Sequence, residues 1–344
     1  MSSTRIAILG TGAQGAGIGA DLVNAGLDVT FIEQWPEHVE AMRRHGIEVR
    51  MPEGTLVTSV NAFHLCEVAT MREKFDIVLL LVKAYDTRWA CELIKPVLAD
   101  DGVIVGLQNG MSIDDIAATV GVKRTIGAVI EMASNMWEPG IVTRQNSPAT
   151  AWFSVGAISD GNDNRVAQVQ QILRHAGTVE ITRDIRSAKW MKLIANAGEL
   201  VPSAILDLPL AEAAALPGVR DFMVECGREA ARATLADGCA LVPIFGMSTV
   251  DVVEADQYAA DLLGRVLSDY SFPDTLTTVL QDWRKGRRGE AAEINGLVVD
   301  VLALKGQHAP ANERTMELAR RIERGELNAQ PSNVSLLLAK GAGS

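Results

Sequence analysis

The residues best suited to chemistry lie in the segment KWMKLIANAGEL, which runs from Lys189 to Leu200. In a helix, Lys192, Asn196 and Glu199 fall together on one face, apart from the apolar residues. A lysine ammonium at this place could protonate the alkoxide that forms when a hydride reduces a ketone. An asparagine one turn later could hold the substrate or orient the lysine. From spacing alone, a solvated lysine beside an incidental asparagine is the simpler interpretation.

Glu290 is a second candidate for chemistry. It lies four residues before Ile294 and seven before Leu297, on the side of a predicted helix that turns toward the core. A buried carboxylate needs a partner. In a cleft, Glu290 would bond the lysine or a substrate hydroxyl, whereas the alternative is a structural pair with an arginine of RKGRRGE. The sequence leaves both alternatives open.

A glycine-rich motif near the start of the chain predicts a dinucleotide site. The motif GTGAQG lies between a predicted strand at Arg5–Leu9 and a predicted helix from about Ala16 to Asn24. Its glycines allow a tight turn, a close approach of the backbone to a pyrophosphate, and close packing of helix on strand. The candidate cofactor-binding residues of this loop are Gly10, Gly12, Ala13, Gln14 and Gly15.

Glu33 bears on the choice of cofactor. It ends the predicted second strand, at the usual distance for a carboxylate that bonds the adenosine ribose and repels a 2′-phosphate. The residues beside it include no arginine, and Arg43 and Arg44 on the following predicted helix, Pro36–His45, are more simply solvated. NADH is therefore favoured as cofactor, and NADPH remains possible.

Two further polar residues follow predicted parallel strands. Lys83 comes after Asp76–Val82, and Asn109 comes after Val103–Leu107. Ligands of open α/β sheets bind at the carboxyl ends of the strands, so both residues are candidates for cofactor binding, and Asn109 also for substrate binding. Asn109 followed by Gly110 could instead be no more than a turn.

The elements that position these residues predict an α/β protein. Strands alternate with helices through the first half, which is typical of an N-terminal Rossmann-type, doubly wound parallel sheet. The stretch from Gly140 to Ser159 is expected to add antiparallel strands that close the sheet. Helical periodicity then predicts an all-helical C-terminal domain, with an irregular insertion or cap from Asp237 to Phe272. We expect domains at 1–185 and 186–344, the second binding substrate and forming a homodimer.

Composition narrows the classes of partner. The chain has 344 residues, 48% of them hydrophobic, and a formal net charge of −11, which disfavours nucleic acid but not an anionic small molecule. Its four cysteines and five histidines are scattered without metal-ligand spacing, so no metal site is expected. Neither a signal peptide nor a membrane-spanning run is evident, so we expect a cytoplasmic protein.

Seven segments occur in an order that resembles the ketopantoate reductase (2-dehydropantoate 2-reductase) family across nearly the whole chain. They are GTGAQG, LLVKAYDT, GLQNGM, PGIVTRQ, KWMKLIANAG, TTVLQDWRKGRRGEAAEING and HAPANERTMELARRIERGE. The resemblance implies that Lys192 is the general acid, with Asn196 and Glu290 beside it in catalysis. It also implies site roles for Lys83 and Asn109.

The chain departs from that family at several positions. Thr278 replaces a serine that contacts substrate. Leu200 and Leu210 stand where pantoate-reducing members carry asparagines. An arginine after the second strand favours NADPH in that family, and this chain has Glu33 and Gln34 there instead. The segment from Asp237 to Phe272 lengthens the lid side. The preferred substrate is therefore expected to be larger or more apolar than ketopantoate.

Three functions compete at this point. The first is a ketopantoate-reductase-like oxidoreductase that transfers a hydride between a nicotinamide cofactor and a small oxo or hydroxy acid, or a related compound. The second is a 3-hydroxyacid-type dehydrogenase with a bulkier substrate, which also pairs a lysine with an asparagine one turn later. The third is a non-catalytic dinucleotide sensor, which would need none of Lys192, Asn196 and Glu290.

Overall fold

The computed structural model describes residues 4–248 and 254–339 of the chain. Its internal contacts divide the chain into two compact units, Met1–Arg186 and Ser187–Ser344. The first unit combines sheets and helices, and the second is built of helices.

The first unit is organised around an eight-stranded sheet. Its order is β12 (Thr178–Ile181), β11 (Trp152–Ala157), β8 (Thr125–Glu131), β7 (Leu98–Gly106), β6 (Phe75–Leu80), β1 (Arg5–Leu9), β2 (Asp28–Glu33) and β5 (Asn61–His64). The six strands from β8 to β5 are parallel. β11 pairs antiparallel with β8, and β12 pairs parallel with β11. This order confirms the predicted Rossmann-type sheet.

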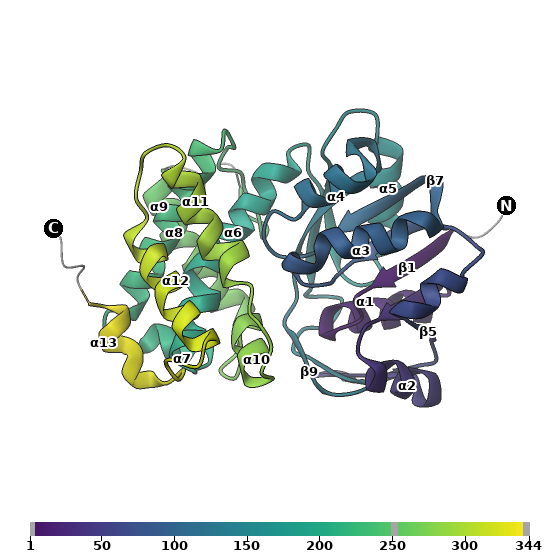
Figure 1. Ribbon diagram of the computed structural model, residues 1–344, viewed down its shortest axis with the longest axis horizontal. Coiled ribbons are helices and arrows are strands. Elements are labelled where there is room, and N and C mark those ends of the chain that lie inside the picture. The colour runs from purple at the N-terminus through teal and green to yellow at the C-terminus, as the bar shows by residue number, and fades with distance from the viewer. Residues whose placement is uncertain (1–3, 249–253, 340–344) are drawn as a thin grey trace. The chain divides into compact units, whose positions relative to one another are not determined.

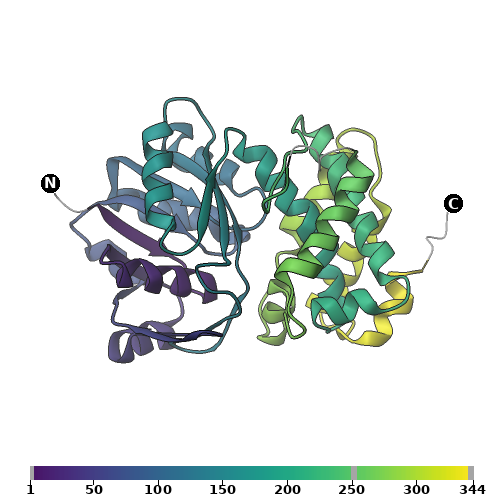
Figure 2. The same ribbon diagram turned by 180° about the vertical axis from the view of Figure 1, so that it is seen from behind.

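Helices cover both faces of this sheet because its central strands are apolar on both sides. In β1, Ile6 and Ile8 join a core with residues of α1 (Ala13–Asn24) and α5 (Asp163–Leu173). Ala7 and Leu9 join the opposite core with α3 (Thr87–Ile94) and α4 (Ile113–Val120). Figure 1 shows α3 in front of the sheet, and the reverse view in Figure 2 brings α1 forward.

A second, four-stranded sheet was not expected. Its order is β4 (Gly54–Thr58), β3 (Ile47–Met51), β10 (Ile141–Arg144) and β9 (Ser134–Glu138). α1 contacts strands of both sheets. The prediction that Gly140–Ser159 closes the main sheet is therefore correct for β11 and wrong for β10, which pairs in parallel with β3. α2 (Pro36–His45) starts at the predicted proline.

The second unit is helical. Its α-helices are α6 (Ile185–Ile205, beginning just before the boundary), α7 (Leu210–Ala215), α8 (Val219–Ala236), α9 (Ala255–Arg265), α10 (Thr278–Arg284), α11 (Leu297–Ala303), α12 (Pro310–Glu323) and α13 (Val334–Leu337). Two π-helical turns span Val266–Tyr270 and Ala292–Gly296. The prediction of an irregular segment from Asp237 to Phe272 is wrong for α9, which buries Tyr258, Ala259, Leu262 and Leu263. Residues 249–253 of that segment lie outside the described residues.

Two contacts fix α6 against its neighbours. A Cβ at Gly198 would lie 2.7 Å from the carbonyl oxygen of Met223, so only glycine lets α6 approach α8 so closely. On another side, Asn295 in the π-helical turn donates to the carbonyl oxygen of Ala197 at 2.9 Å and to Oδ1 of Asn312 at 2.8 Å. The turn that follows Glu290 is thereby attached to the helix that carries Lys192.

Candidate functional site

The glycine loop turns tightly against the sheet and leaves space at Gly12. Gly10 has φ +92°, and a Cβ there would lie 2.6 Å from the backbone nitrogen of Val82. A Cβ at Gly15 would lie 2.2 Å from the carbonyl oxygen of Gly10. At Gly12, by contrast, a Cβ would meet no atom within 4 Å in the part of the chain that the structure describes. The loop is thus closed toward the sheet and open at Gly12, just before the first amides of α1, which have no acceptor within the helix.

The strand register brings three predicted residues to one edge of the sheet. Three neighbouring strands pair with one another at one row: Leu9 of β1, Leu80 of β6 and Gly106 of β7. Gly12, Lys83 and Asn109 each lie three residues beyond this row, at the carboxyl ends of parallel strands. Lys83 and Asn109 are half-buried. Gly110, with φ +72°, forms the turn after Asn109, so the predicted turn and the predicted location at the strand end are both observed.

Glu33 is buried and bonded within its own chain. Its Oε2 accepts from the backbone nitrogen and hydroxyl of Thr11 at 2.6 and 3.1 Å. Its Oε1 accepts from the backbone nitrogens of Gln34 and Trp35 at 2.8 and 3.0 Å. Four bonds match the acceptor capacity of a carboxylate, so Glu33 holds the glycine loop. A ribose hydroxyl could bond Glu33 only by replacing one of these four donors. The carboxylate nevertheless places a negative charge at the end of β2.

His38 also fixes the glycine loop, and sequence reasoning missed it. Its Nδ1 accepts from the backbone nitrogen of Gly140 at 2.9 Å, so the ring proton of the neutral form is on Nε2, which donates to the carbonyl oxygen of Thr11 at 2.8 Å. Burial lowers the pKa of His38, although the charge of Glu33 and the bond to Thr11 oppose that shift. The only available signal was its position two residues after Pro36, on the helix that follows Glu33.

Two other side chains near the loop are held by the protein. Gln14 donates to the carbonyl oxygen of Met132 at 3.2 Å. Arg43 donates to the carbonyl oxygen of Ala62 and to the carboxylates of Glu40 and Glu67. The interpretation of Arg43 as simply solvated is therefore wrong, and its guanidinium is engaged in holding α2 to β5 and to the segment after it.

In the second unit, α6 carries a buried polar stripe. Its members recur at alternating intervals of three and four residues: Lys189, Lys192, Asn196, Glu199 and Ser203. The Lys192 side chain is 12% exposed and the other four residues are at most 3% exposed. A run of polar groups on the buried side of a helix is costly unless each has a partner or a function. The prediction that Lys192 and Asn196 share a face is confirmed by this helix, and a solvated lysine is inconsistent with the burial.

Glu199 and Phe245 both lie close to the ammonium of Lys192. Its Nζ lies 3.8 Å from Oε1 of Glu199, one turn beyond Asn196. On another side it lies 5.2 Å from the centre of the Phe245 ring. Sequence reasoning placed Glu199 on this face but missed Phe245, which comes from the segment between α8 and α9.

Lys189 is a second buried lysine, and sequence reasoning did not single it out. Burial lowers its pKa to about 8, and the charge of Glu290 opposes that shift. Glu290 is buried too, so the two charged groups interact electrostatically within the second unit. Among the arginines of RKGRRGE, Arg288 donates to Glu293 at 2.6 Å. The signal in the sequence was the spacing of three residues between Lys189 and Lys192.

Two threonines at the start of α10 differ in their surroundings. The hydroxyl of Thr277 donates to the carbonyl oxygen of Leu200 at 3.0 Å. The hydroxyl oxygen of Thr278 is buried and has no hydrogen-bond partner within residues 4–248 and 254–339. Leu200 and Leu210 are both buried.

Comparisons with known proteins assign the family. Residues 6–157 match the family described as "Ketopantoate reductase PanE/ApbA", and residues 184–323 match its C-terminal domain family. The chain belongs to the ketopantoate reductase family. The 2-dehydropantoate 2-reductase of Pyrococcus horikoshii is 27% identical over 90% of this chain and 94% of that protein. The ketopantoate reductase from Ralstonia eutropha JMP134 is 28% identical, with a TM-score of 0.78 over 94% of this chain and 99% of that one.

The same fold occurs in D-mandelate dehydrogenase. D-mandelate dehydrogenase superposes with a TM-score of 0.83 at 20% identity, over 94% of this chain and 99% of that one. At this identity the likeness concerns the fold. The ketopantoate reductase fold is therefore shared by enzymes named for different acids, 2-dehydropantoate and D-mandelate.

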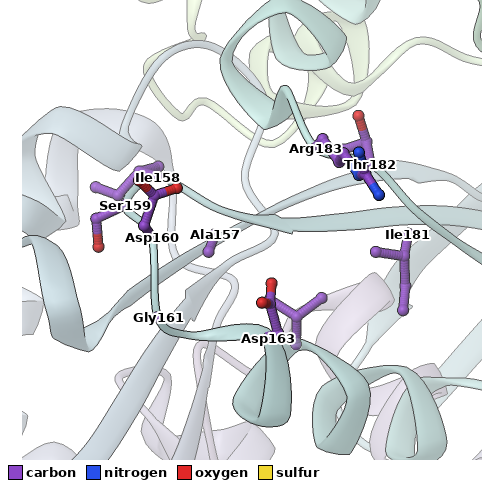
Figure 3. Close-up of a pocket in the computed structure, with 10 residues that line it drawn as sticks. Ala157, Ile158, Ser159, Asp160, Gly161, Asp163, Ile181, Thr182 and Arg183 are labelled. Atoms are coloured by element: carbon purple, nitrogen blue, oxygen red, sulfur yellow. The ribbon is translucent and has the colours of Figure 1, made fainter.

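A separate cavity of about 480 Å³ lies in the first unit. Figure 3 shows residues of the β11–α5 connection and the end of β12 around it, including Asp160, Asp163 and Arg183. Because β11 runs antiparallel to β8, this cavity is at the sheet edge opposite the glycine loop. None of the residues that line it in the described structure is one that the sequence predicted for the site.

The described residues also bear on whether the chain could bind a metal ion or span a membrane. Across residues 4–248 and 254–339, no group of three or more His, Cys, Asp and Glu side chains is placed to hold a metal ion. In the same ranges no helix is long and apolar enough to cross a bilayer.

Proposed function

We propose that the chain is a nicotinamide-dependent reductase of a small 2-oxo acid or related carbonyl compound, with Lys192 as general acid. The observation that carries the proposal is the buried polar stripe of α6, in which Lys192 and Asn196 lie one turn apart. A structural helix of this kind would bury apolar side chains, whereas a proton donor must be held where water is scarce.

The residues of the first unit fit a dinucleotide. Gly12 leaves open space before the start of α1, and Gly10 and Gly15 allow the tight turn around it. Lys83 and Asn109, at the ends of β6 and β7, would bind other parts of the cofactor, and Asn109 is also a candidate for binding substrate. The D-mandelate dehydrogenase that shares this fold is described with NADH. A bound reduced nicotinamide supplies a hydride to the carbonyl carbon.

The residues of the second unit would donate the proton and bind the substrate. Lys192 gives the proton of its Nζ to the carbonyl oxygen as negative charge develops there, and its ammonium stabilises that charge. Asn196 holds the substrate or orients the lysine. Glu290 accepts a hydrogen bond from a substrate hydroxyl, with Lys189 balancing its charge. The unpartnered hydroxyl of Thr278 is a further donor to substrate.

We propose NADH as the preferred cofactor. Glu33 is bonded by Thr11, Gln34 and Trp35, so the argument rests on its charge more than on a bond to ribose. A carboxylate at the end of β2 repels the 2′-phosphate of NADPH. Arg43 is held by Glu40 and Glu67 and is not available to neutralise that phosphate.

We also propose that the substrate is larger or more apolar than ketopantoate. Leu200 and Leu210 offer no hydrogen bond to a substrate hydroxyl, and the ring of Phe245 adds apolar surface next to Lys192. The substrate's carboxylate and carbonyl would then be held by charged and amide groups, and its remainder by apolar ones.

The experiment that tests this function combines binding with turnover. The protein is titrated with NADH and with NADPH by fluorescence, and each cofactor is then assayed with a panel of 2-oxo and 3-oxo acids. We expect NADH to bind at least tenfold more tightly, about 1.4 kcal/mol, and at least one 2-oxo acid to be reduced. A tenfold preference for NADPH would contradict the cofactor assignment. Tight binding of NADH without turnover of any acid in either direction would instead indicate a dinucleotide sensor.

A further inference from the structure

The position of Phe245 over Lys192 is enforced by its own segment. The segment is attached to α6 by two bonds, from Trp190 Nε1 to Asp237 at 2.9 Å and from the backbone nitrogen of Ala240 to the hydroxyl of Ser187 at 3.0 Å. It is attached to α9 by the hydroxyl of Tyr258, which donates to the carbonyl oxygen of Val242 at 2.8 Å. These bonds leave the chain little freedom just before it reaches Phe245.

The backbone of Phe245 is itself strained. Its φ is +54°, in the left-handed region that non-glycine residues rarely adopt, and its side chain is 2% exposed. The ring of Tyr270 packs against it at 5.3 Å between centres, tilted by 48°. A strained backbone is retained when its surroundings determine the side chain's position, and such residues concentrate at functional sites. The aromatic face is therefore held over the Lys192 ammonium.

Glu199 and Phe245 both favour the charged form of this ammonium. A carboxylate within about 4–6 Å stabilises a cation, and Glu199 lies at 3.8 Å. The face of an aromatic ring within about 6 Å of a cation attracts it, and Phe245 lies at 5.2 Å. Neither neighbour attracts a neutral amine to the same degree. Burial acts in the opposite direction, because a desolvated lysine tends to lose its proton.

We propose that Glu199 and Phe245 form a two-sided clamp that holds Lys192 in place as a protonated ammonium. The proposal rests on the proposed function, in which Lys192 donates a proton from Nζ to the carbonyl oxygen. After that step Lys192 is a neutral amine, and it takes up one proton from water to complete the cycle. The clamp favours that uptake, so it keeps Lys192 protonated, and able to act as the general acid, at neutral pH. Glu199 and Phe245 are positioning residues and act through Lys192.

Other titratable groups pack near this part of α6. Lys189 lies one turn before Lys192 and interacts with Glu290, and two like charges on one helix face repel. Asp237 is bonded to Trp190, and Tyr270 carries a phenol beside Phe245. These four groups are the same in the parent protein and in variants of Glu199 and Phe245. Their effects on proton binding by Lys192 therefore cancel when a variant is compared with the parent protein.

The test is an NMR titration of the full chain labelled with [6-13C]lysine, in which the Lys192 signal is identified by its loss in Lys192→Arg. We expect the proton-binding constant of Lys192 to fall roughly three- to thirtyfold in Phe245→Leu, which keeps an apolar side chain but removes the ring. Glu199→Gln is expected to lower it as well. Phe245→Trp, with the stronger aromatic face, is expected to leave it unchanged or raise it.

Matched controls come from the same unit. Phe272→Leu makes the same exchange at an exposed ring that follows the π-helical turn Val266–Tyr270, and Glu225→Gln removes an exposed carboxylate of α8. Neither is expected to change the Lys192 titration. An unaltered Lys192 titration in folded Glu199→Gln and Phe245→Leu would overturn the clamp, as would weaker proton binding in Phe245→Trp. Because the titration needs no turnover, failure of the proposed function would show separately, as unaltered turnover in a Lys192 variant.

Discussion

Lys189 and Lys192 lie one turn apart on the same buried stripe of α6, and each has a carboxylate of its own. Glu290 interacts with Lys189, and Glu199 lies 3.8 Å from Lys192. Two lysines so close would repel each other if both were left without a counter-charge. The paired arrangement gives them different roles, because Lys189 balances Glu290 while Lys192 is the candidate proton donor.

This pairing predicts a double-mutant cycle in stability. Lys189→Met removes the charge that faces Glu290, and breaking one side of a buried pair typically costs about 3–5 kcal/mol. Glu290→Gln in the Lys189→Met background is expected to recover a substantial part of that loss, because no unpaired charge remains. Urea unfolding of the two single variants and the double variant measures the coupling. Strictly additive losses would show that the two side chains are energetically independent.

The open space at Gly12 predicts a variant that separates folding from cofactor binding. Gly12 has φ −61° and ψ −166°, an extended backbone with negative φ, and a Cβ there meets no atom of the described residues within 4 Å. Gly12→Ala is therefore expected to change the free energy of unfolding by less than about 0.5 kcal/mol. Its methyl group would lie where the pyrophosphate approaches, so NADH affinity is expected to fall tenfold or more.

Gly10→Ala is the matched comparison. Its φ of +92° and the 2.6 Å approach of Val82 predict a clear loss of stability, of at least about 1–2 kcal/mol. Thermal melts and NADH titrations of both variants provide the measurements. If Gly12→Ala bound NADH as tightly as the parent protein, the pyrophosphate would have to lie elsewhere.

The buried His38 predicts acid sensitivity of the first unit. Burial lowers the pKa of His38, and its Nδ1 must stay unprotonated to accept from Gly140. The stability that depends on the neutral ring is thus present above the unfolded pKa of about 6.5 and is lost as pH falls through it, because the unfolded chain takes up the proton first. One proton changes the free energy of unfolding by at most about 1.4 kcal/mol per pH unit.

His38→Gln keeps a donor and an acceptor but does not titrate. Urea unfolding from pH 8 to pH 5 is expected to show a smaller decline for this variant than for the parent protein, even if it starts from a lower value. Carboxylates elsewhere contribute equally to the pH dependence of both proteins, so their contribution cancels when the two declines are subtracted. Parallel declines would mean that His38 does not contribute to the pH dependence.

The two leucines predict a substrate preference. A substrate hydroxyl buried beside Leu200 and Leu210 without a partner loses about 1–3 kcal/mol, which corresponds to roughly a 5- to 150-fold loss in kcat/KM. Ketopantoate is therefore expected to be a poorer substrate than bulkier 2-oxo or 3-oxo acids. Comparison of kcat/KM across such a panel checks this. If ketopantoate matched the best of them, at about 10⁴ M⁻¹s⁻¹ or above, the leucines would not determine specificity.

The strands of the main sheet could be predicted because their patterns are local. Phe75–Leu80 is almost wholly apolar and is buried on both faces, and Asp28–Glu33 follows the glycine loop and its helix at a standard distance. The second sheet has no such signal. Gly54–Thr58 is mostly exposed, and Ile47–Met51 gains a parallel partner only from Ile141–Arg144, far along the chain. Pairing at that sequence separation is not visible in a local pattern.

Local sequence patterns also fail to predict parts of the second unit. The side of the predicted helix that carries Ile294 and Leu297 is fully buried only at Ile294, and the buried positions that follow are Val298 and Leu302. The π-helical turn Ala292–Gly296 lengthens the repeat and moves the buried face by one residue. In the site, Lys192, Asn196 and Glu199 followed from helical spacing. Phe245 did not, because its approach depends on a strained backbone and on bonds to Trp190, Ser187 and Tyr258.

The central claim is that Lys192 is the general acid, and Lys192→Ala tests it most directly. Turnover of the best oxo acid is measured alongside NADH affinity, with Lys305→Ala, an exposed lysine of the same unit, as control. Loss of a general acid predicts a fall in kcat of about 10²- to 10⁴-fold. NADH affinity should stay nearly unchanged, because the glycine loop belongs to the other unit. Near-normal turnover in Lys192→Ala would contradict the assignment.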